Sequence, residues 1–150
     1  MGRGMYFEDL ELGFSFTTGA RTITSTDIVN FACLSGDFNE VHSNWEYCKD
    51  TPFGEPIAHG PMIYAICGGL SYAAGFNEGT ALALLGITDW KLLRPVKHGD
   101  TIRMESVVVG RKLSRKPDRG TVTFRRMILN QRDELVQQMT ATLLYRTRGS

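Results

Sequence analysis

The sequence predicts an α+β fold, in which a strand and helices precede a meander of about four antiparallel strands. Residues 102–107 and 121–125 alternate between polar and apolar side chains, which is typical of half-buried antiparallel strands. Residues 56–77 contain no Asp, Glu, Lys or Arg, which favours a buried helix. Because the helical and strand patterns are segregated along the chain, they indicate α+β and not a doubly wound α/β fold.

The first half of the chain contains the signals of an early strand and a helix. Residues 14–23 are mixed and rich in β-branched side chains, so a strand is predicted there. The triplet Ser25-Thr26-Asp27 predicts a helix start, helically spaced apolar residues follow, and Gly36 predicts the end. The breakers between 37 and 56 predict an irregular segment, with a turn of helix at 44–49.

A long apolar helix is predicted over residues 61–74, because Pro61 suits the first helical position and Gly75 suits a helix end. Since one small sheet covers one side of such a helix, a second copy of the chain is a reasonable source of further cover. We predict one domain over residues 1–150. The strands expected after the helix are 82–93, 101–113, 120–130 and 134–146.

Composition excludes several classes of protein. The chain has 150 residues, 42% of them hydrophobic, with 17 Lys and Arg against 16 Asp and Glu, which is ordinary for a globular protein and weakly charged for a binder of nucleic acid. The first residues carry charges and lack an apolar stretch, and residues 56–77 include prolines and glycines, so neither a signal peptide nor a membrane span is predicted.

Three cysteines form no C-x-x-C pair and are too few for a disulfide framework, which favours a cytoplasmic setting and no zinc site. Cys33 and Cys67 fall in apolar stretches, so both are expected to be packing residues. No base near Cys67 in the sequence supports a nucleophilic role for it.

The densest polar cluster joins the first predicted helix to the long one. Asp37 and His42 lie five residues apart in a predicted loop, and a carboxylate with an imidazole suits proton transfer near neutral pH. His59 and Gly60 precede the long helix, whose free amides can stabilise an oxyanion. This equipment suits chemistry beside a thioester carbonyl. From spacing alone, Asp37 also fits a cap or turn residue and His59 a structural histidine.

Two linked segments resemble the hydratase signature of the MaoC-like dehydratase family, which includes the (R)-specific enoyl-CoA hydratases. Residues 31–42 read FACLSGDFNEVH and residues 53–60 read FGEPIAHG, matching the forms D-x-N-x-x-H and F-G-x-P-I-A-H-G before a long helix. Residues 95–100, PVKHGD, resemble the P-V-x-x-G-D turn of the family. The resemblance covers nearly the whole chain.

The resemblance implies a hot-dog fold, with a curved antiparallel sheet wrapped around a long central helix, usually in a homodimer or a dimer-based oligomer. It implies that Asp37 and His42 are the catalytic dyad, that Asn39 shapes the loop and helps to orient the water, and that the Gly60 amide binds the thioester oxygen. His59 is placed with Asn39 among the substrate-binding residues. The implied enzyme is a hydro-lyase that adds water reversibly, in syn fashion, to a trans-2-enoyl thioester. The coenzyme A thioester is then a substrate, and neither a cofactor nor a metal is implied.

Two positions depart from the family pattern: Gly68 stands where a serine is common, with Ser71 one turn further on, and Glu40 stands where a proline is common. The first departure leaves the support of the loop and the shape of the acyl pocket open. The sequence also leaves open which dyad member is the base, the length and branching of the acyl chain, and a second carboxylate on it.

Exposed cations near the pocket are expected to meet the phosphates of coenzyme A. Lys91 and Arg94 are the substrate-binding candidates, with Lys97 beside them. A second basic cluster keeps an acyl-carrier-protein substrate open; its residues are Arg111, Lys112, Arg115, Lys116 and Arg119. Each cation is also consistent with an ordinary solvated strand end.

Two other function classes remain beside the hydratase. Hot-dog proteins also include thioesterases, and a non-catalytic binder of acyl thioesters would have the same fold. The paired Asp37 and His42 favour the hydratase. Aromatic residues near the helix fit an acyl tunnel, but a place in the core is favoured for them. These residues are Trp45, Tyr47, Phe53, Tyr64 and Tyr72.

Overall fold

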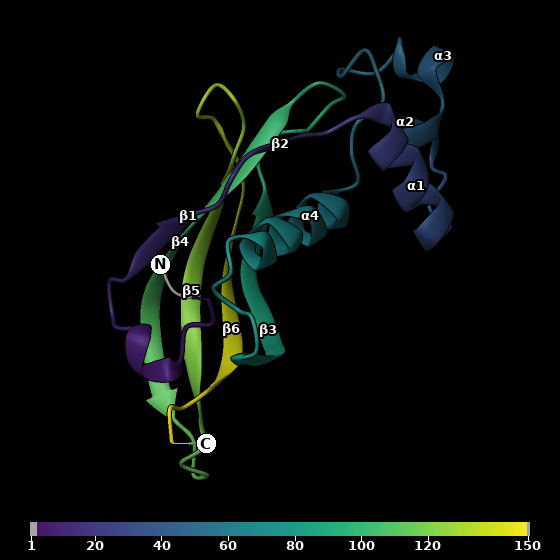
Figure 1. Ribbon diagram of the computed structural model, residues 1–150. Coiled ribbons are helices and arrows are strands. Elements are labelled where there is room, and N and C mark those ends of the chain that lie inside the picture. The colour runs from purple at the N-terminus through teal and green to yellow at the C-terminus, as the bar shows by residue number, and fades with distance from the viewer. Residues whose placement is uncertain (1–2, 150) are drawn as a thin grey trace.

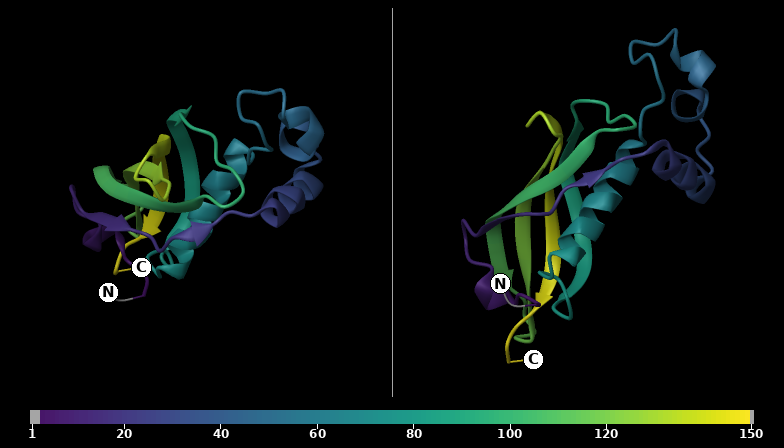
Figure 2. Two further views of the ribbon diagram at one scale, coloured as in Figure 1. Left: turned by 90° about the horizontal axis from the view of Figure 1, so that it is seen from above. Right: turned by 45° about the horizontal axis from the view of Figure 1, so that its top comes forward.

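A six-stranded antiparallel sheet curves around one long helix, α4 (Gly60–Ala73), in the computed structural model (Figures 1 and 2). The structure describes residues 3–149. The strand order is β1-β4-β5-β6-β3, and β2 pairs with β4 outside this path. The strands are β1 (Ser15–Thr17), β2 (Arg21–Thr22), β3 (Ala81–Leu92), β4 (Thr101–Leu113), β5 (Arg119–Leu129) and β6 (Leu135–Arg146).

The four long strands are confirmed to within a residue or two at each end, but only β4, β5 and β6 form a meander, because β3 crosses over to pair with β6. The early strand is the exception, because it is divided into β1 and β2, which pair with separate parts of β4. Thr18 lies between them, and its hydroxyl oxygen accepts a hydrogen bond from the Met104 amide at 3.0 Å. A side chain thus takes a place in the ladder that a backbone carbonyl would otherwise fill, which interrupts the strand.

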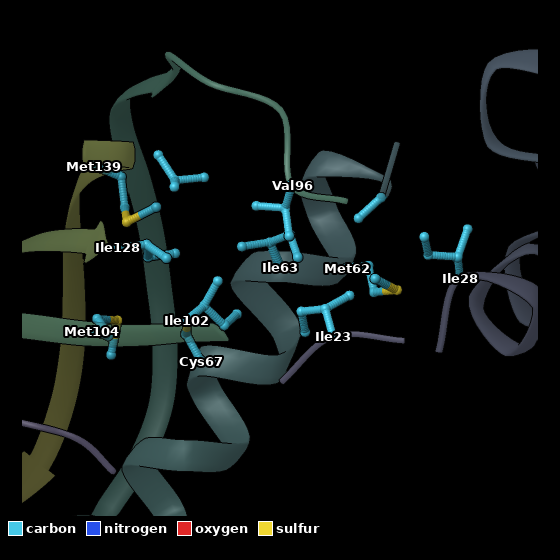
Figure 3. Close-up of a cluster of buried hydrophobic side chains, with 12 residues drawn as sticks. Ile23, Ile28, Met62, Ile63, Cys67, Val96, Ile102, Met104, Ile128 and Met139 are labelled. Atoms are coloured by element: carbon cyan, nitrogen blue, oxygen red, sulfur yellow. The ribbon is translucent and has the colours of Figure 1, made fainter. Parts of the chain in front are cut away.

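Helix α4 packs along the concave side of the sheet through one side of its surface (Figure 3). Its buried residues Met62, Ile63 and Cys67 recur at helical spacing and meet Ile102, Met104 and Ile128 from the strands. The remaining surface of the helix is uncharged and exposed. It includes Ala65, Gly68, Gly69 and Tyr72.

The two ends of the sheet are covered by different elements. A 3-10 helix, η1 (Phe7–Asp9), was not predicted and covers the lower end, where Phe7 packs with Phe124 and Tyr145. The hairpin between β4 and β5 lies at this end, beside the C-terminus (Figure 1). The start of α4 lies at the opposite end.

Three short helices project from the body beyond the start of α4 (Figures 1 and 2): α1 (Ser25–Ser35), α2 (Glu40–Ser43) and α3 (Trp45–Cys48). The predicted α1 and α3 are confirmed. Helix α2 was missed, since residues 37–56 were predicted to be irregular apart from the turn of α3. It is a single turn, capped by Asn39 through a bond from the Val41 amide to the Asn39 side-chain oxygen at 3.3 Å.

Several residues that were predicted to be packed in the core are exposed in the single chain. Cys33 is exposed, because the buried side of α1 is formed by Ile28 and Ala32. Cys48 and Cys67 are buried. Trp45, Tyr47 and Tyr72 are also exposed and so are not core residues. Among the described residues, no helix combines the length and apolarity that a membrane crossing needs.

Replacement of Thr24 by Ala is expected to lower the free energy of unfolding by about 1 kcal/mol, measured by urea denaturation at a fixed protein concentration. Thr24 and Asp27 form a reciprocal capping box, in which the Thr24 amide donates to Asp27 at 2.8 Å. Thr26→Ala is the matched control, because Thr26 is exposed on the same turn. Equal losses in both variants would contradict the capping role.

Candidate active site

A cavity of about 450 Å³ opens where the start of α4 meets the ends of β3 and β6. His42 and Gly60 both line it, so the structure brings together two of the predicted site residues from separate elements. The other lining residues are mostly apolar: Phe53, Ile57, Ala58, Ile63, Leu92, Leu93, Arg94, Pro95, Val96 and Gln137. Such a lining suits the acyl part of a ligand.

The orientation of the His42 ring is fixed by one backbone carbonyl. Its Nδ1 lies 2.7 Å from the carbonyl oxygen of Ile57, and a carbonyl oxygen accepts hydrogen bonds and does not donate them. Neutral His42 therefore carries its proton on Nδ1 and presents the lone pair of Nε2. The Val41 carbonyl accepts from the Ile57 amide at 3.0 Å, so the residue before His42 is joined to the same residue, Ile57, that holds the ring.

Asp37 follows the end of α1, where Gly36 adopts the left-handed conformation with φ 76°. The Asn39 amide donates to the Asp37 carboxylate at 3.2 Å, which sets the direction of that side chain. Asp37 Oδ2 lies 3.9 Å from His42 Nε2. With neutral His42 both atoms are acceptors, so neither donates to the other, and one group with two O–H donors can donate to both. The Asp37 side chain is 52% exposed, so this side of the site is open in the single chain.

His59 lies behind the pair and is almost fully buried. Its Nε2 donates to the Asp37 carbonyl oxygen at 2.9 Å, and its ring stacks on His42 with 3.8 Å between the ring centroids. These contacts hold the backbone of one dyad member and the ring of the other. The structure thus places His59 behind Asp37 and His42, and not on the wall of the cavity described above.

Gly60 is the first residue of α4, and Pro61, which has no amide hydrogen, follows it. Within residues 3–149 the Gly60 amide donates to no other group, as expected for the first turn of a helix. A Cβ added at Gly60 would overlap the Leu92 side chain. Glycine is therefore the residue that leaves both the cavity wall and its own amide unobstructed.

The predicted cations are placed differently from one another. Arg94 lines the cavity and pairs with Glu134 at 3.1 Å. Lys91 does not reach this cavity and lines a separate hollow with Arg125 and Gln138. Lys97 donates to the Phe53 carbonyl oxygen at 2.6 Å, so it braces the loop before α4.

The second basic cluster lies around the β4–β5 hairpin, at the end of the sheet opposite the cavity (Figure 1). Arg111 packs over the Phe7 ring at 4.2 Å, and Arg119 pairs with its neighbour Asp118. In the single chain, therefore, this cluster is not at the mouth of the cavity.

Sequence reasoning missed Gln137, which is buried on β6 and lines the cavity. Its Nε2 donates to the Gly60 carbonyl oxygen at 2.9 Å, and its Oε1 accepts from Trp90 Nε1 at 2.9 Å. The side chain thereby fixes the first turn of α4 against the sheet. The signal in the sequence is weak, because Gln137 and Gln138 are adjacent and only the strand register decides which of them faces inward.

Asp37, His42 and His59 also have the residue types of a metal site, with one ligand atom of each within 4.8 Å of the others. Two of the four ring nitrogens bond to backbone carbonyls, so they are not free to coordinate. The prediction that the site needs no metal stays a prediction.

Burial raises the pKa of the Cys67 thiol to about 12, with the charge of Arg126 opposing the shift. A thiol with this pKa carries very little thiolate near neutral pH, which disfavours a nucleophilic role.

Known proteins resemble this chain over most of its length. The MaoC like domain model matches residues 11–127. The (R)-specific enoyl-CoA hydratase of Rhodospirillum rubrum is 35% identical over 144 residues, which cover 96% of this chain and 94% of that protein. Protein MaoC of Klebsiella aerogenes is 39% identical over 99 residues, or 66% of this chain, but the match spans 29% of that longer protein.

Solved structures agree with the fold. The structure titled monoamine oxidase regulatory protein from Archaeoglobus fulgius superposes with a TM-score of 0.88 at 36% identity, covering 98% of each chain. A Mycobacterium tuberculosis protein described as having a double hotdog fold has a TM-score of 0.84 at 23% identity, covering 96% of this chain and 44% of that one, which supports the fold alone. The predicted hot-dog fold is confirmed.

The curated relatives include proteins named hydratase and dehydratase, names consistent with the predicted hydro-lyase class. The matched segment contains the whole of the Asp37–Gly60 region and most of the sheet. The chain belongs to the MaoC-like domain family.

Proposed function

We propose that the protein is an (R)-specific enoyl-CoA hydratase, which adds water reversibly to a trans-2-enoyl thioester and gives a (3R)-hydroxyacyl thioester. The observation that carries the proposal is the pair of facing acceptors, Asp37 Oδ2 and His42 Nε2, 3.9 Å apart beside the cavity that holds Gly60. The family membership and the hydratase name of the Rhodospirillum rubrum relative support the same reaction.

In the proposed reaction one water donates a hydrogen bond to each member of the dyad. The water oxygen forms a bond to the β-carbon while one of its protons passes to the dyad, and the dyad delivers a proton to the α-carbon. Because the hydroxyl group and the proton come from the same side of the substrate, the addition is syn. Either Asp37 or His42 takes the first proton, since both present acceptors to the water.

Negative charge develops on the thioester oxygen during this addition. We assign its stabilisation to the Gly60 amide, which is free at the positive end of α4. Gln137 donates to the carbonyl of the following peptide, that of Gly60, and so fixes the direction of the turn. His59 is then a positioning residue and Asn39 a loop-shaping one, because their bonds act on Asp37 and on the backbone.

The carrier of the acyl chain is proposed to be coenzyme A, with an acyl carrier protein as the other possible carrier. Arg94 at the cavity is the cation best placed for a phosphate. No cofactor enters the proposed reaction. A thioesterase is less favoured, because the site presents two acceptors for one water beside the cavity, and the buried Cys67 has a raised pKa.

We infer that the working unit is a homodimer. Strand β3 is one edge of the sheet and exposes Leu84 and Leu85 along its length, and the adjacent α4 exposes Tyr72. A long apolar edge strand beside an uncharged helix face is a liability in a monomer and pairs readily with a copy of itself.

Asp37→Asn and His42→Ala are each expected to lower kcat/KM for hydration of crotonyl-CoA by at least about 100-fold, since the first removes a carboxylate that can take up a proton and the second removes the imidazole that accepts from the shared water. The assay follows loss of the enoyl absorbance and free thiol together, and the product is tested for the (3R) configuration. Asp50→Asn is the matched control, an exposed carboxylate in the same segment. Rates near wild type in either folded variant would defeat the assignment, and release of free thiol by the wild type would favour the thioesterase.

Gly60→Ala is expected to lower kcat/KM on the order of 100-fold, because the new methyl group pushes on Leu92 and obstructs the amide that meets the oxyanion. Gly19→Ala is the control, since a Cβ at Gly19 meets nothing within 4 Å. Hydration kinetics measure the effect, and the melting temperature reports on the fold. An unchanged kcat in Gly60→Ala would remove the oxyanion role from this amide.

Sedimentation at micromolar concentration is expected to give a dimer for the wild type and a monomer for the double variant Leu85→Lys/Tyr72→Lys. The charges would be buried without partners in the inferred interface. Leu113→Lys is the control, because Leu113 is equally exposed at the far hairpin. A monomeric wild type, or a double variant that stays dimeric, would contradict the inferred interface.

A further inference from the structure

The core between the sheet and α4 contains one buried cation without a counter-charge. Arg126 is 4% exposed and occupies an inward position of β5, between the inward residues Phe124 and Ile128. Within residues 3–149 no carboxylate pairs with it, and its one hydrogen bond runs from Nη1 to the Tyr64 hydroxyl at 3.4 Å. A guanidinium keeps its charge in proteins, and the Phe124 ring, whose centroid lies 5.4 Å from its central carbon, offsets only part of the cost of burial, so an anion would lower that cost further.

Other donors around Arg126 also lack partners. Arg126 Nε, Ser106 Oγ and Ser71 Oγ are buried and form no hydrogen bond among the described residues. Ser106 is the direct cross-strand neighbour of Arg126, so their Cβ atoms lie about 5 Å apart. Ser71 lies one turn beyond Cys67 on α4 and Ser106 two residues beyond Met104 on β4, and Cys67 and Met104 pack in the same core cluster. A guanidinium with a free Nε and two serine hydroxyls without partners have the donors that an anion requires.

This group of donors lies further along the same helix and sheet surfaces that line the cavity at Gly60. Tyr64 is one turn after Gly60, roughly 6 Å along the helix axis at 1.5 Å per residue. On the sheet, Gln137 at the cavity pairs with Ile128, and Arg126 faces the same way about 7 Å further along β5.

A continuous series of contacts joins the two places. Gln137 accepts from Trp90, the Trp90 and Tyr64 rings lie 5.5 Å apart between centroids, and Tyr64 accepts from Arg126. A ligand whose thioester lies at Gly60 and whose chain enters between α4 and the sheet is therefore directed toward the guanidinium.

We propose that Arg126, with Ser71 and Ser106, binds a carboxylate at the far end of the acyl chain, so that the preferred substrates are thioesters of dicarboxylic acids. This inference rests on the proposed function for the position of the thioester, and it adds the class of acyl chain. A carboxylate satisfies the charge of Arg126 and accepts from the serine hydroxyls, which an alkyl chain end does not do.

The first test measures binding without turnover. Saturated thioesters are compared in pairs of equal length, succinyl-CoA with butyryl-CoA and adipyl-CoA with hexanoyl-CoA, by calorimetry. The wild type is expected to bind the carboxylated member at least about tenfold more tightly in one of the two pairs. Equal or weaker binding of the carboxylated member in both pairs would overturn the proposal.

Variants then assign the effect to Arg126. Arg126→Met is expected to weaken binding of the preferred carboxylated thioester on the order of 100-fold and to leave its alkyl partner unchanged. Arg126→Lys is expected to restore part of the loss. The matched control is Arg125→Met, which removes the exposed neighbouring arginine. Equal weakening of both thioesters by Arg126→Met, with a lower melting temperature, would show that Arg126 acts through the core and would overturn the proposal.

Turnover separates this inference from the proposed function. The corresponding trans-2-enoyl thioesters, with a methyl or a carboxylate end, are assayed for hydration. Preferred binding of the carboxylated thioesters without hydration of any enoyl thioester would support the carboxylate site and defeat the hydratase. Hydration of the methyl-ended chains with no preference in binding would support the hydratase and overturn the carboxylate site.

Discussion

The bond between His42 Nδ1 and the Ile57 carbonyl is the interaction on which the candidate chemistry depends. It gives neutral His42 a lone pair on Nε2, facing a carboxylate that is also an acceptor. Two acceptors do not bond to each other, but both can accept hydrogen bonds from one water. Water is also the reactant that the hydration of a double bond consumes. If the tautomer were reversed, His42 Nε2 would carry a proton and could no longer accept a hydrogen bond from that water.

The rest of the fold holds this pair against the start of α4. The Ala58 amide donates to the Val96 carbonyl at 2.7 Å, which fastens the chain just before α4 to the loop that follows β3. His59 then ties the projecting helices to the body through the Asp37 carbonyl, and Gln137 ties the first turn of α4 to β6. The dyad and the Gly60 amide therefore belong to one connected set of backbone positions, although they come from different elements.

The long strands and α4 were predictable because their patterns are local: period-two alternation in β4 and β5, and an uncharged run that ends near Gly75. Helix α2 was not, because a single capped turn has no periodicity to detect. The division between β1 and β2 depends on a bond between Thr18 and Met104, which are far apart in sequence. The approach of Asp37 to His42 followed from the family resemblance, whereas the roles of Gln137 and Arg126 depend on strand register, which the sequence alone does not fix.

Arg126 shows how burial and function are linked in this core. An apolar residue in its place would pack between Phe124 and Ile128 at no cost in desolvation, as the other inward positions of β5 do. A cation there lowers the stability of the empty protein and raises the affinity for an anion, because the surrounding low dielectric strengthens their attraction. In the proposed complex the Gly60 amide meets the charge that develops at the thioester, and Arg126 meets a charge that the substrate carries throughout. The first interaction strengthens during the reaction and accelerates it, whereas the second is constant and selects the substrate.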